Sequence, residues 1–345
     1  MNESSGDTNV NIEWCHEILE DVSRTFALPI EMIEQPLSDY TCVGYLMCRI
    51  SDTIEDSPDL DTQTKERMLD EYEVLVEELD EDSLNVFLDS VADNKPSNPI
   101  EPDHWELVEN TDRVISAFKA FPEDARDSIS PTVTEMIDGM RMFCLRYKDG
   151  VRIQTLDELE TYCYYVAGTV GHMLARLASN RSDYPSEEIH ESAEEYGLML
   201  QMVNITKDIY GDFEEENNVY VPADVLEKYS VEQDELLEDK NIHKTSEVLD
   251  ELIEETRDFV GGARRFVEIV SEGDEENLSS WALPYLLSIA TLRELEDNST
   301  QSLEQGGVKM DKTEVFQIIS EAKTIDEDNF RELEDKISEY PLHKQ

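Results

Sequence analysis

Positive charge is scarce in this chain of 345 residues. Lysine and arginine together number 28 against 82 aspartates and glutamates, so the formal net charge at pH 7 is −54. Nucleic acids and anionic lipid surfaces are both bound through cationic side chains that neutralise phosphate. The composition therefore predicts no nucleic-acid partner and no electrostatic docking on an anionic membrane.

The acidic residues are spread along almost every segment instead of forming one acidic tail. Self-repulsion among so many carboxylates strains a compact fold in dilute buffer, but the Debye length falls to about 3 Å at molar ionic strength. We therefore interpret the composition as adaptation to a salt-rich cytoplasm, and it resembles that of haloarchaeal proteins. Intrinsic disorder is the alternative, and the apolar periodicity described below opposes it.

Cysteine and long apolar runs are also sparse. The scattered cysteines contain no CxxC pair, which favours reduced core residues over a disulfide framework or a zinc site, and the histidines show no ligand spacing. No apolar run reaches the roughly 18 residues that a membrane span needs. Since the first residues are polar and acidic, we expect no secretory signal, no transmembrane segment and a cytoplasmic protein. The cysteines are Cys15, Cys42, Cys48, Cys144 and Cys163.

Apolar residues recur every three to four positions through most of the chain, which is typical of helices with one buried face. The pattern predicts an all-α fold, a single helical domain over 13–340, preceded by a flexible acidic tail over 1–12. The predicted helices cover about 13–34, 38–56, 62–92, 104–120, 124–148, 156–180, 187–213, 245–271, 278–296 and 312–337.

Two aspartate-rich patterns stand out on these helices. In the first, Asp52 and Asp56 are four residues apart and share a helix face with Arg49. In the second, Asn204, Asp208 and Asp212 follow one another at intervals of four, after the mostly apolar stretch 196–203, which predicts a continuous buried polar stripe. Carboxylates placed in this way repel one another unless a hard cation lies between them. The patterns predict magnesium sites that also hold a diphosphate and that face each other across one cavity, and the alternative is two solvated acidic faces.

These motifs resemble those of the squalene and phytoene synthases, in the same order and over about residues 15–310. Ser23-Arg24-Thr25-Phe26 is similar to the opening substrate-binding motif of that family, and the Tyr162–Gly171 segment resembles the squalene-synthase form of its central helix. The other segments that carry the resemblance are Tyr45 to Asp56, Gln201 to Asp212, Tyr220-Val221-Pro222 and Trp281 to Leu292.

The resemblance implies an isoprenoid-synthase-like, single-domain helical bundle around a central cavity and a role for each matched residue. Tyr162 would handle a proton in the first half-reaction, unless it is a core aromatic, and Gly168 and Gly171 would allow close helix packing or leave room beside the substrate. Magnesium would be held by Asp52, Asp56, Asn204, Asp208 and Asp212. Diphosphate oxygens or the rim of the site would be contacted by Ser23, Arg24, Tyr45 and Arg49, although Arg24 or Arg49 could instead pair with nearby acids. The other substrate-binding residues would be Tyr165, Gln201 and Lys207.

The implied reaction joins two farnesyl diphosphates head to head, through presqualene diphosphate, to squalene with NADPH as reductant. Lys309 is the candidate contact for NADPH, whereas Asp311 stands where the family has a base, and Lys207 replaces an arginine. A phytoene synthase acting on geranylgeranyl diphosphate without a reductant is one alternative, and a non-catalytic assembly or binding factor is another. The remaining expectations are a monomer that makes weak peripheral membrane contact for product release.

The charge predicts that folding depends on salt. Because screening weakens the repulsion among the carboxylates, the melting temperature should rise strongly between dilute and molar potassium chloride, as measured by circular dichroism. A flat or falling melting temperature over that range would contradict adaptation to salt.

Overall fold

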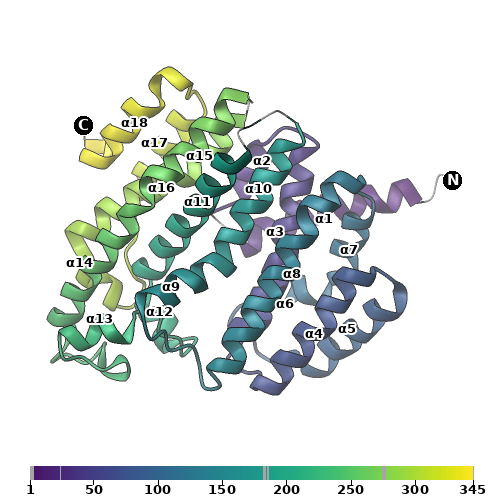
Figure 1. The fold of residues 1–345 in the computed structure, drawn as a ribbon, viewed down its shortest axis with the longest axis horizontal. Helices are drawn as coiled ribbons and strands as arrows, with labels where there is room; N and C mark the ends of the chain where they lie inside the picture. Colours follow the sequence, from purple (N-terminus) through teal and green to yellow (C-terminus); the bar gives the residue numbers. More distant parts are fainter. Residues whose placement is uncertain (1–3, 24, 182–183, 185, 274–276, 345) are drawn as a thin grey trace. The chain divides into compact units, whose positions relative to one another are not determined.

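The computed structural model describes the whole chain except residues 1–3, 24, 182–183, 185, 274–276 and 345. Helices make up most of the described residues (Figure 1), and β-pairing among them is limited to an isolated parallel bridge between Arg152 and Val219. The predicted all-α class is confirmed. Nowhere in the described helices is there a stretch long and apolar enough to cross a membrane.

The chain divides into two compact units. The first comprises Met1–Lys148 and His172–Asp183, and the second comprises Asp149–Gly171 and Tyr184–Gln345. Residues 4–12, which we expected to form a flexible tail, are part of the first helix in this structure. A single domain over 13–340 stays a prediction.

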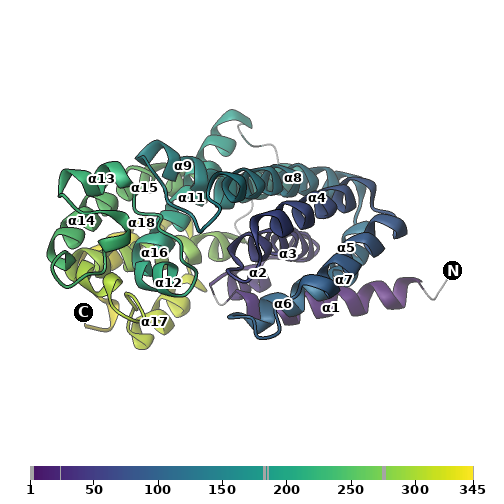
Figure 2. The same ribbon diagram turned by 90° about the horizontal axis from the view of Figure 1, so that it is seen from below.

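Helix α3 (Leu37–Asp56) is the core element of the first unit. Fifteen of its 20 residues are buried, so it is covered on nearly all sides, and it packs against α1, α4, α6, α7 and α8 (Figure 2). All five cysteines are buried free thiols, as predicted. The other helices of this unit are α1 (Ser4–Val22), α2 (Ala27–Met32), α4 (Thr62–Glu78), α5 (Glu81–Asn94), α6 (Pro102–Glu109), α7 (Thr111–Lys119) and α8 (Glu123–Arg146).

Helix α11 (Ser186–Lys207) is the core element of the second unit, where it packs against α14, α15, α16 and a π-helical turn, η1 (Tyr164–Gly168).

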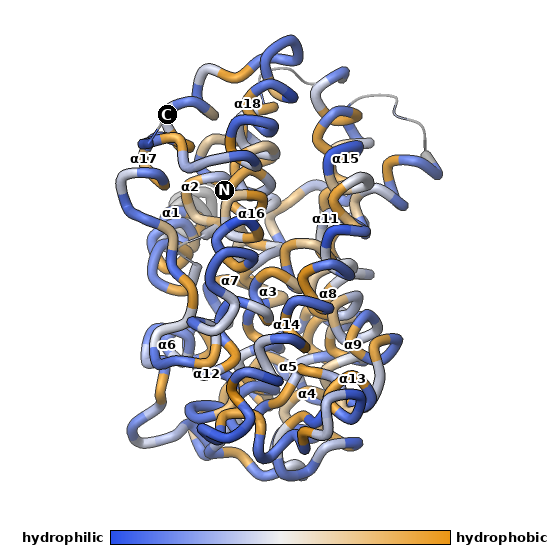
Figure 3. The backbone as a smooth tube through the Cα atoms, turned by 90° about the vertical axis from the view of Figure 1, so that its left-hand side faces the viewer, coloured by the Kyte–Doolittle hydropathy of each residue, from blue (hydrophilic) through white to orange (hydrophobic). Residues whose placement is uncertain are grey.

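Hydrophobic and hydrophilic residues alternate along helices such as α15 and α18 (Figure 3). The remaining helices are α9 (Leu156–Cys163), α10 (Thr169–Ser179, which the unit boundary divides), α12 (Ile209–Glu214), α13 (Ala223–Lys228), α14 (Ile242–Asp258), α15 (Val260–Gly273), α16 (Leu278–Asn298), α17 (Lys312–Ala322) and α18 (Glu327–Glu339), with short 3-10 turns at Gln233–Glu235, Ser299–Leu303 and Leu342–Lys344.

Several helices that were predicted as continuous are interrupted, and α13 was not predicted. The break after α4 falls at Leu79, which adopts a left-handed conformation (φ 51°), and Asp80 then caps α5 by accepting from Ser83 N. Asp326 similarly begins α18 with a capping box. Side-chain capping therefore marks two of the breaks, at Asp80 and Asp326, although the apolar period continues through them. The affected predictions are 13–34, 62–92, 104–120, 187–213, 245–271 and 312–337.

Three glycines allow the backbones of the second unit to approach closely. A Cβ on Gly171 would lie 2.0 Å from the carbonyl oxygen of Ala193, and a Cβ on Gly197 would lie 2.2 Å from that of Ala167. At Gly168 a Cβ would lie 2.9 Å from Leu198. The glycines of the Tyr162–Gly171 motif therefore serve close helix packing, which was one of their two expected roles.

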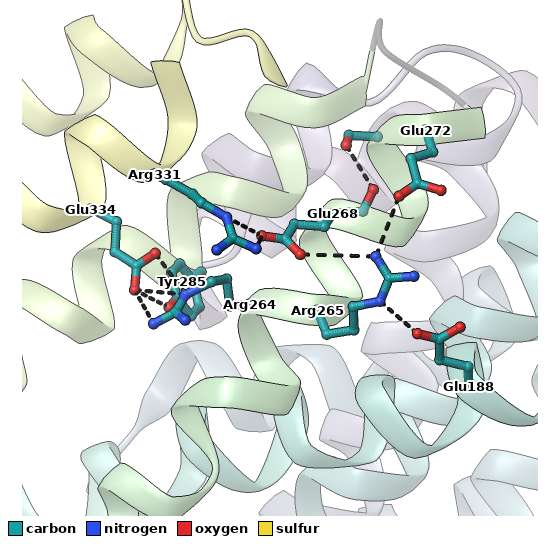
Figure 4. A network of polar contacts seen from close by, with 9 residues as sticks. Glu188, Arg264, Arg265, Glu268, Glu272, Tyr285, Arg331 and Glu334 are labelled. Carbon is teal, nitrogen blue, oxygen red and sulfur yellow. Dashed lines mark hydrogen bonds and ion pairs between the residues drawn. The ribbon is translucent and has the colours of Figure 1, made fainter. Parts of the chain in front are cut away.

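Some of the few cations of the chain connect helices through contacts with acids. In the second unit, Arg265 on α15 contacts Glu188, Glu268 and Glu272, with a closest approach of 2.6 Å to Glu188 on α11 (Figure 4). Arg264 forms a bidentate pair with the buried Glu334 on α18 at 2.7–3.0 Å. Since these arginines connect different helices, scarce positive charge is concentrated where it ties the fold together.

The glycine packing makes a prediction about stability. Gly171→Ala should lower the free energy of unfolding by about 1–3 kcal/mol or more, because its Cβ would overlap a backbone oxygen that cannot easily move. Gly261→Ala is the matched control, since its Cβ would meet no atom within 4 Å, and it should be neutral or stabilising by up to about 1 kcal/mol. Denaturant unfolding of both variants in molar salt measures the difference. Equal effects of the two substitutions would show that the close approach is unimportant.

Candidate functional site

The first aspartate motif occupies the C-terminal turns of α3 in the first unit. Asp52 is 6% exposed and Asp56 is half-buried, so both carboxylates lie in mostly apolar surroundings. Ser57 ends the helix directly after Asp56 with an extended backbone, just before Pro58. The predicted stop and the shared helical turn of the two aspartates are both confirmed.

Arg49 joins this motif to Tyr45. Its guanidinium donates to Tyr45 Oη at 2.8 Å and forms a very close ion pair with Asp52. The two acids of the motif and the Tyr45 hydroxyl raise the pKa of Arg49 above its already high value, against the effect of burial. Pairing with a local acid, the alternative considered for Arg49, is thus present in the structure, while contact with diphosphate stays a proposal.

Asp56 is incompletely neutralised by its neighbours. Its Oδ1 is buried and has no hydrogen-bond partner, and the same is true of Oε2 of the adjacent Glu55. The pKa of Asp56 is raised to about 7, first by burial and then by the Asp52 carboxylate, whereas a side-chain hydrogen bond with Glu55 and the charges of Arg49 and Lys65 act in the opposite direction. Burial likewise raises the pKa of Glu55. Buried carboxylate oxygens without donors fit a hard divalent cation, which prefers oxygen ligands.

Glu55 and Lys65 were not among the predicted site residues. Lys65, on α4, donates from Nζ to the carbonyl oxygen of Glu55. Lys65 could not be identified from the sequence, because a turn separates it from the motif. Glu55 is 3% exposed, and its place between Ile54 and Asp56 on a buried helix could have identified it.

The second aspartate motif lies in the second unit and is not the continuous buried stripe that we predicted. Helix α11 ends at Lys207, and Asp208 leaves the helical conformation (φ −132°, ψ 38°) before α12 begins. The NH of Asp212 still donates to the carbonyl of Asp208 at 3.2 Å. Asn204 is exposed, and Asp208 and Asp212 are half-buried. Because the helix is interrupted at Asp208, the three residues are spaced four apart in the sequence but do not lie along one face of a single helix.

A second chain segment holds this break in place. Val308 NH donates to the carbonyl of Lys207 at 2.9 Å, and Val308 packs into a core cluster with Val203 of α11. A Cβ on Gly307 (φ 58°) would lie 2.4 Å from the Lys207 oxygen and 3.1 Å from Oδ1 of Asp208. Asp208 is therefore enclosed by backbone that only glycine permits at that position.

The bond from Val308 to Lys207 also places the backbone of the next residue, Lys309, near the second motif. Lys309 is exposed, and Lys207 is half-buried with its pKa lowered by burial, an effect that Asp208 and Asp212 oppose. Asp311, which stands where the family has a base, is the N-cap of α17, since its side chain accepts from Thr313 NH at 2.7 Å. Asp311 thus stabilises the start of α17. Lys309, directly after the docked Val308, is the positively charged residue of this segment that lies nearest to it in the sequence.

Tyr162 lies at the end of α9, just before the π-helical turn, a feature that is frequent at functional sites. It is 2% exposed, and its Oη is 3.0 Å from that of Tyr220. Gln201 on α11 and Tyr165 in the π-turn are half-buried in the same unit. Tyr220 has no predicted role, although it belongs to the Tyr220-Val221-Pro222 segment that carries the family resemblance.

The opening motif is only partly described. Ser23 is buried after α1, and its Oγ accepts from Phe26 NH at 3.3 Å, while the ring of Phe26 lies 5.5 Å from that of Tyr45. Arg24 lies outside the described residues. Within the described part of the chain, no three His, Cys, Asp or Glu side chains gather closely enough to hold a metal alone. The predicted convergence of both motifs on one cavity stays a prediction.

Comparison with known proteins places these motifs in a family. The squalene/phytoene synthase family model matches residues 19–314. Squalene synthases of Schizosaccharomyces pombe and Dictyostelium discoideum are 30% and 29% identical over 91% and 84% of this chain, which spans 66% and 65% of their lengths. A solved complex of TcSQS with the ligand BPH1237 has the same fold, with a TM-score of 0.80 at 24% identity over 95% of this chain and 90% of that one.

The family match covers both aspartate motifs, the π-turn and the segment docked on Asp208, and it agrees with the all-helical fold. The chain belongs to the squalene/phytoene synthase family of head-to-head prenyltransferases.

Proposed function

We propose that this protein condenses two farnesyl diphosphates into presqualene diphosphate and reduces that intermediate to squalene. The observation that carries the proposal is the end of α3, where the buried Asp52 and the half-buried Asp56 lie near Arg49 and Asp56 retains a buried oxygen without a donor. A largely buried helix with such a carboxylate fits a metal that in turn binds a diphosphate. The relatedness to named squalene synthases supports the choice of substrate.

The metal ligands in this proposal are Asp52 and Asp56 of α3, together with Asn204, Asp208 and Asp212. Bound magnesium would supply Lewis acidity that polarises the diphosphate leaving group. Among the chain's own groups, Arg49 and Lys207 would hold diphosphate oxygens, assisted by Ser23 and Tyr45. Lys207 would do so as a point charge, because its ammonium lacks the planar fork of an arginine.

Tyr162, Tyr165 and Gln201 would face the reacting hydrocarbon part of the substrates. A carbocation survives only where water is excluded, and aromatic faces stabilise it without trapping it. The burial of Tyr162 suits such a role. Tyr162 would also handle the proton that leaves when the cyclopropane ring closes.

NADPH is the proposed reductant, with Lys309 as its contact. The backbone bond between Val308 and Lys207 keeps this lysine near the second aspartate motif. Phytoene formation from geranylgeranyl diphosphate, without a reductant, is the second candidate. It is favoured by one observation, that Asp311 caps a helix where the family has a base.

The metal site predicts a magnesium-dependent gain in stability. In molar potassium chloride, which saturates general screening, magnesium at 100 times its dissociation constant should stabilise the wild type by about 2.7 kcal/mol. Asp56→Asn should lose most of this gain and should be no less stable without magnesium, because it removes a buried charge.

Asp89→Asn, at an exposed position of α5, is the control and should keep the full gain. Thermal unfolding of the three proteins with and without magnesium measures the effect. An Asp56→Asn protein that responds to magnesium like the wild type would exclude Asp56 as a ligand.

The two half-reactions make a prediction about products. Asp208→Asn should slow consumption of farnesyl diphosphate at least 100-fold, roughly the cost of removing one strong transition-state contact. Withholding NADPH from the wild type should leave the first step intact, so presqualene diphosphate or a rearranged, unreduced product accumulates. Mass spectrometry identifies the hydrocarbons.

Lys309→Ala should shift the products of the complete reaction partly toward those seen without NADPH, whereas Lys323→Ala, at another exposed lysine, should not. Conversion of geranylgeranyl diphosphate to phytoene, unaffected by NADPH, would overturn the squalene assignment and favour the second candidate. A protein with both motifs that turns over neither substrate would point to a non-catalytic binding factor.

A further inference from the structure

Tyr162 is one end of a chain of hydrogen bonds within the second unit. Its hydroxyl lies 3.0 Å from that of Tyr220, and the two rings pack with centroids 4.8 Å apart. Both side chains are buried, at 2% and 6% exposure. A buried pair of hydroxyls must share its hydrogens in a fixed order, because water cannot readily replace either partner.

Asn218 sets that order. Its Oδ1 accepts from the NH of Val151 at 2.9 Å, so its Nδ2 faces Tyr220 and donates to the Tyr220 oxygen at 3.2 Å. With an amide donor on its oxygen, the Tyr220 hydroxyl still has its own hydrogen, which can be donated to Tyr162 Oη. The bonds then connect Val151, Asn218, Tyr220 and Tyr162 in that order.

The backbone that carries Asn218 and Tyr220 is fixed on both sides. Val219 NH donates to the carbonyl of Val151 at 2.8 Å, and Ile153 NH donates to that of Val219 at 3.1 Å. In this extended segment residues two apart face the same side, which points Asn218 and Tyr220 together at Tyr162. A Cβ on Gly150 (φ 98°) would lie 2.0 Å from the oxygen of Asn217, so the turn before this pairing is equally tight.

The same segment is bonded to the second aspartate motif. The NH of Asn218 donates to the carbonyl of Asp212 at 2.7 Å. Asn218 thus contacts both a proposed metal ligand, through its backbone, and the tyrosine pair, through its side chain. Asn218 is thus one link between the motif and Tyr162 within this unit, beside the packing of α11 on α9 and on the π-helical turn.

We propose that Tyr220, supported by Asn218, is a positioning residue for Tyr162. A hydrogen bond donated to Tyr162 Oη orients the phenol and stabilises negative charge on its oxygen while a proton is transferred. The inference rests on the proposed function, because it assigns Tyr162 the proton lost when the cyclopropane forms. It adds two residues for which composition and the aspartate patterns gave no role.

The test is Tyr220→Phe, which keeps the packed ring and deletes the hydroxyl. In the full protein supplied with magnesium and farnesyl diphosphate, kcat for the first half-reaction should fall about 10- to 100-fold, within the range of general acid–base contributions. KM should change less than about twofold, because no substrate contact is removed. The pH profile of kcat should shift as well. Asn218→Ser should give a smaller loss in the same direction.

The double variant Tyr162→Phe/Tyr220→Phe should be no slower than Tyr162→Phe alone, since Tyr220 acts only through Tyr162. Tyr196→Phe is the matched control: it removes another buried hydroxyl of the same unit, which donates to the carbonyl of Trp281 at 3.0 Å. That change should lower stability and leave kcat and its pH profile unaltered.

A Tyr220→Phe protein with wild-type kcat, or losses that multiply in the double variant, would overturn the proposal. So would an effect confined to KM. If the wild type converts geranylgeranyl diphosphate instead, the proposed substrate is wrong. The variants are then compared on that substrate, whose head-to-head condensation also releases a proton, and the comparison still decides the role of Tyr220.

Discussion

Positive charge has to be shared among many carboxylates in this chain, because 82 acids stand against 28 lysines and arginines. Arg141 in the first unit contacts Asp70, Glu73 and Asp138, and Arg265 in the second contacts three glutamates. Exposed pairs of this kind contribute little individually and more as networks. Most of the remaining acids depend on solvent and salt for their neutralisation.

The same shortage shapes the site. At the end of α3, one arginine and one lysine approach three carboxylic acids in apolar surroundings, and Asp56 keeps an oxygen without a donor. Burial makes this arrangement costly for ionised groups unless a further cation is present. We regard the incomplete neutralisation as the physical basis for metal and diphosphate binding, since a fully paired site would have no use for either.

Close backbone approach is the second device that organises the site. Gly171 and Gly197 let the π-turn region and α11 meet, and Gly307 encloses Asp208 at the break between α11 and α12. The break also frees the Lys207 carbonyl to accept from Val308. Segments distant in the sequence, 150–171, 201–220 and 306–309, are thereby fixed to one another inside the second unit.

The amino-acid sequence by itself determined the all-α class, the ends of α3, the buried cysteines and the first aspartate pair, because helical periodicity and i, i+4 spacing are local properties of the chain. It also carried the family motifs. It did not reveal the interruption at Asp208, the docking of Val308 on Lys207 or the cap formed by Asp311. Tertiary structure decided these, since a helix end depends on which partner takes its freed carbonyl. The link from Asn218 through Tyr220 to Tyr162 spans 58 residues between its tyrosines, and only folding brings those hydroxyls within hydrogen-bonding distance.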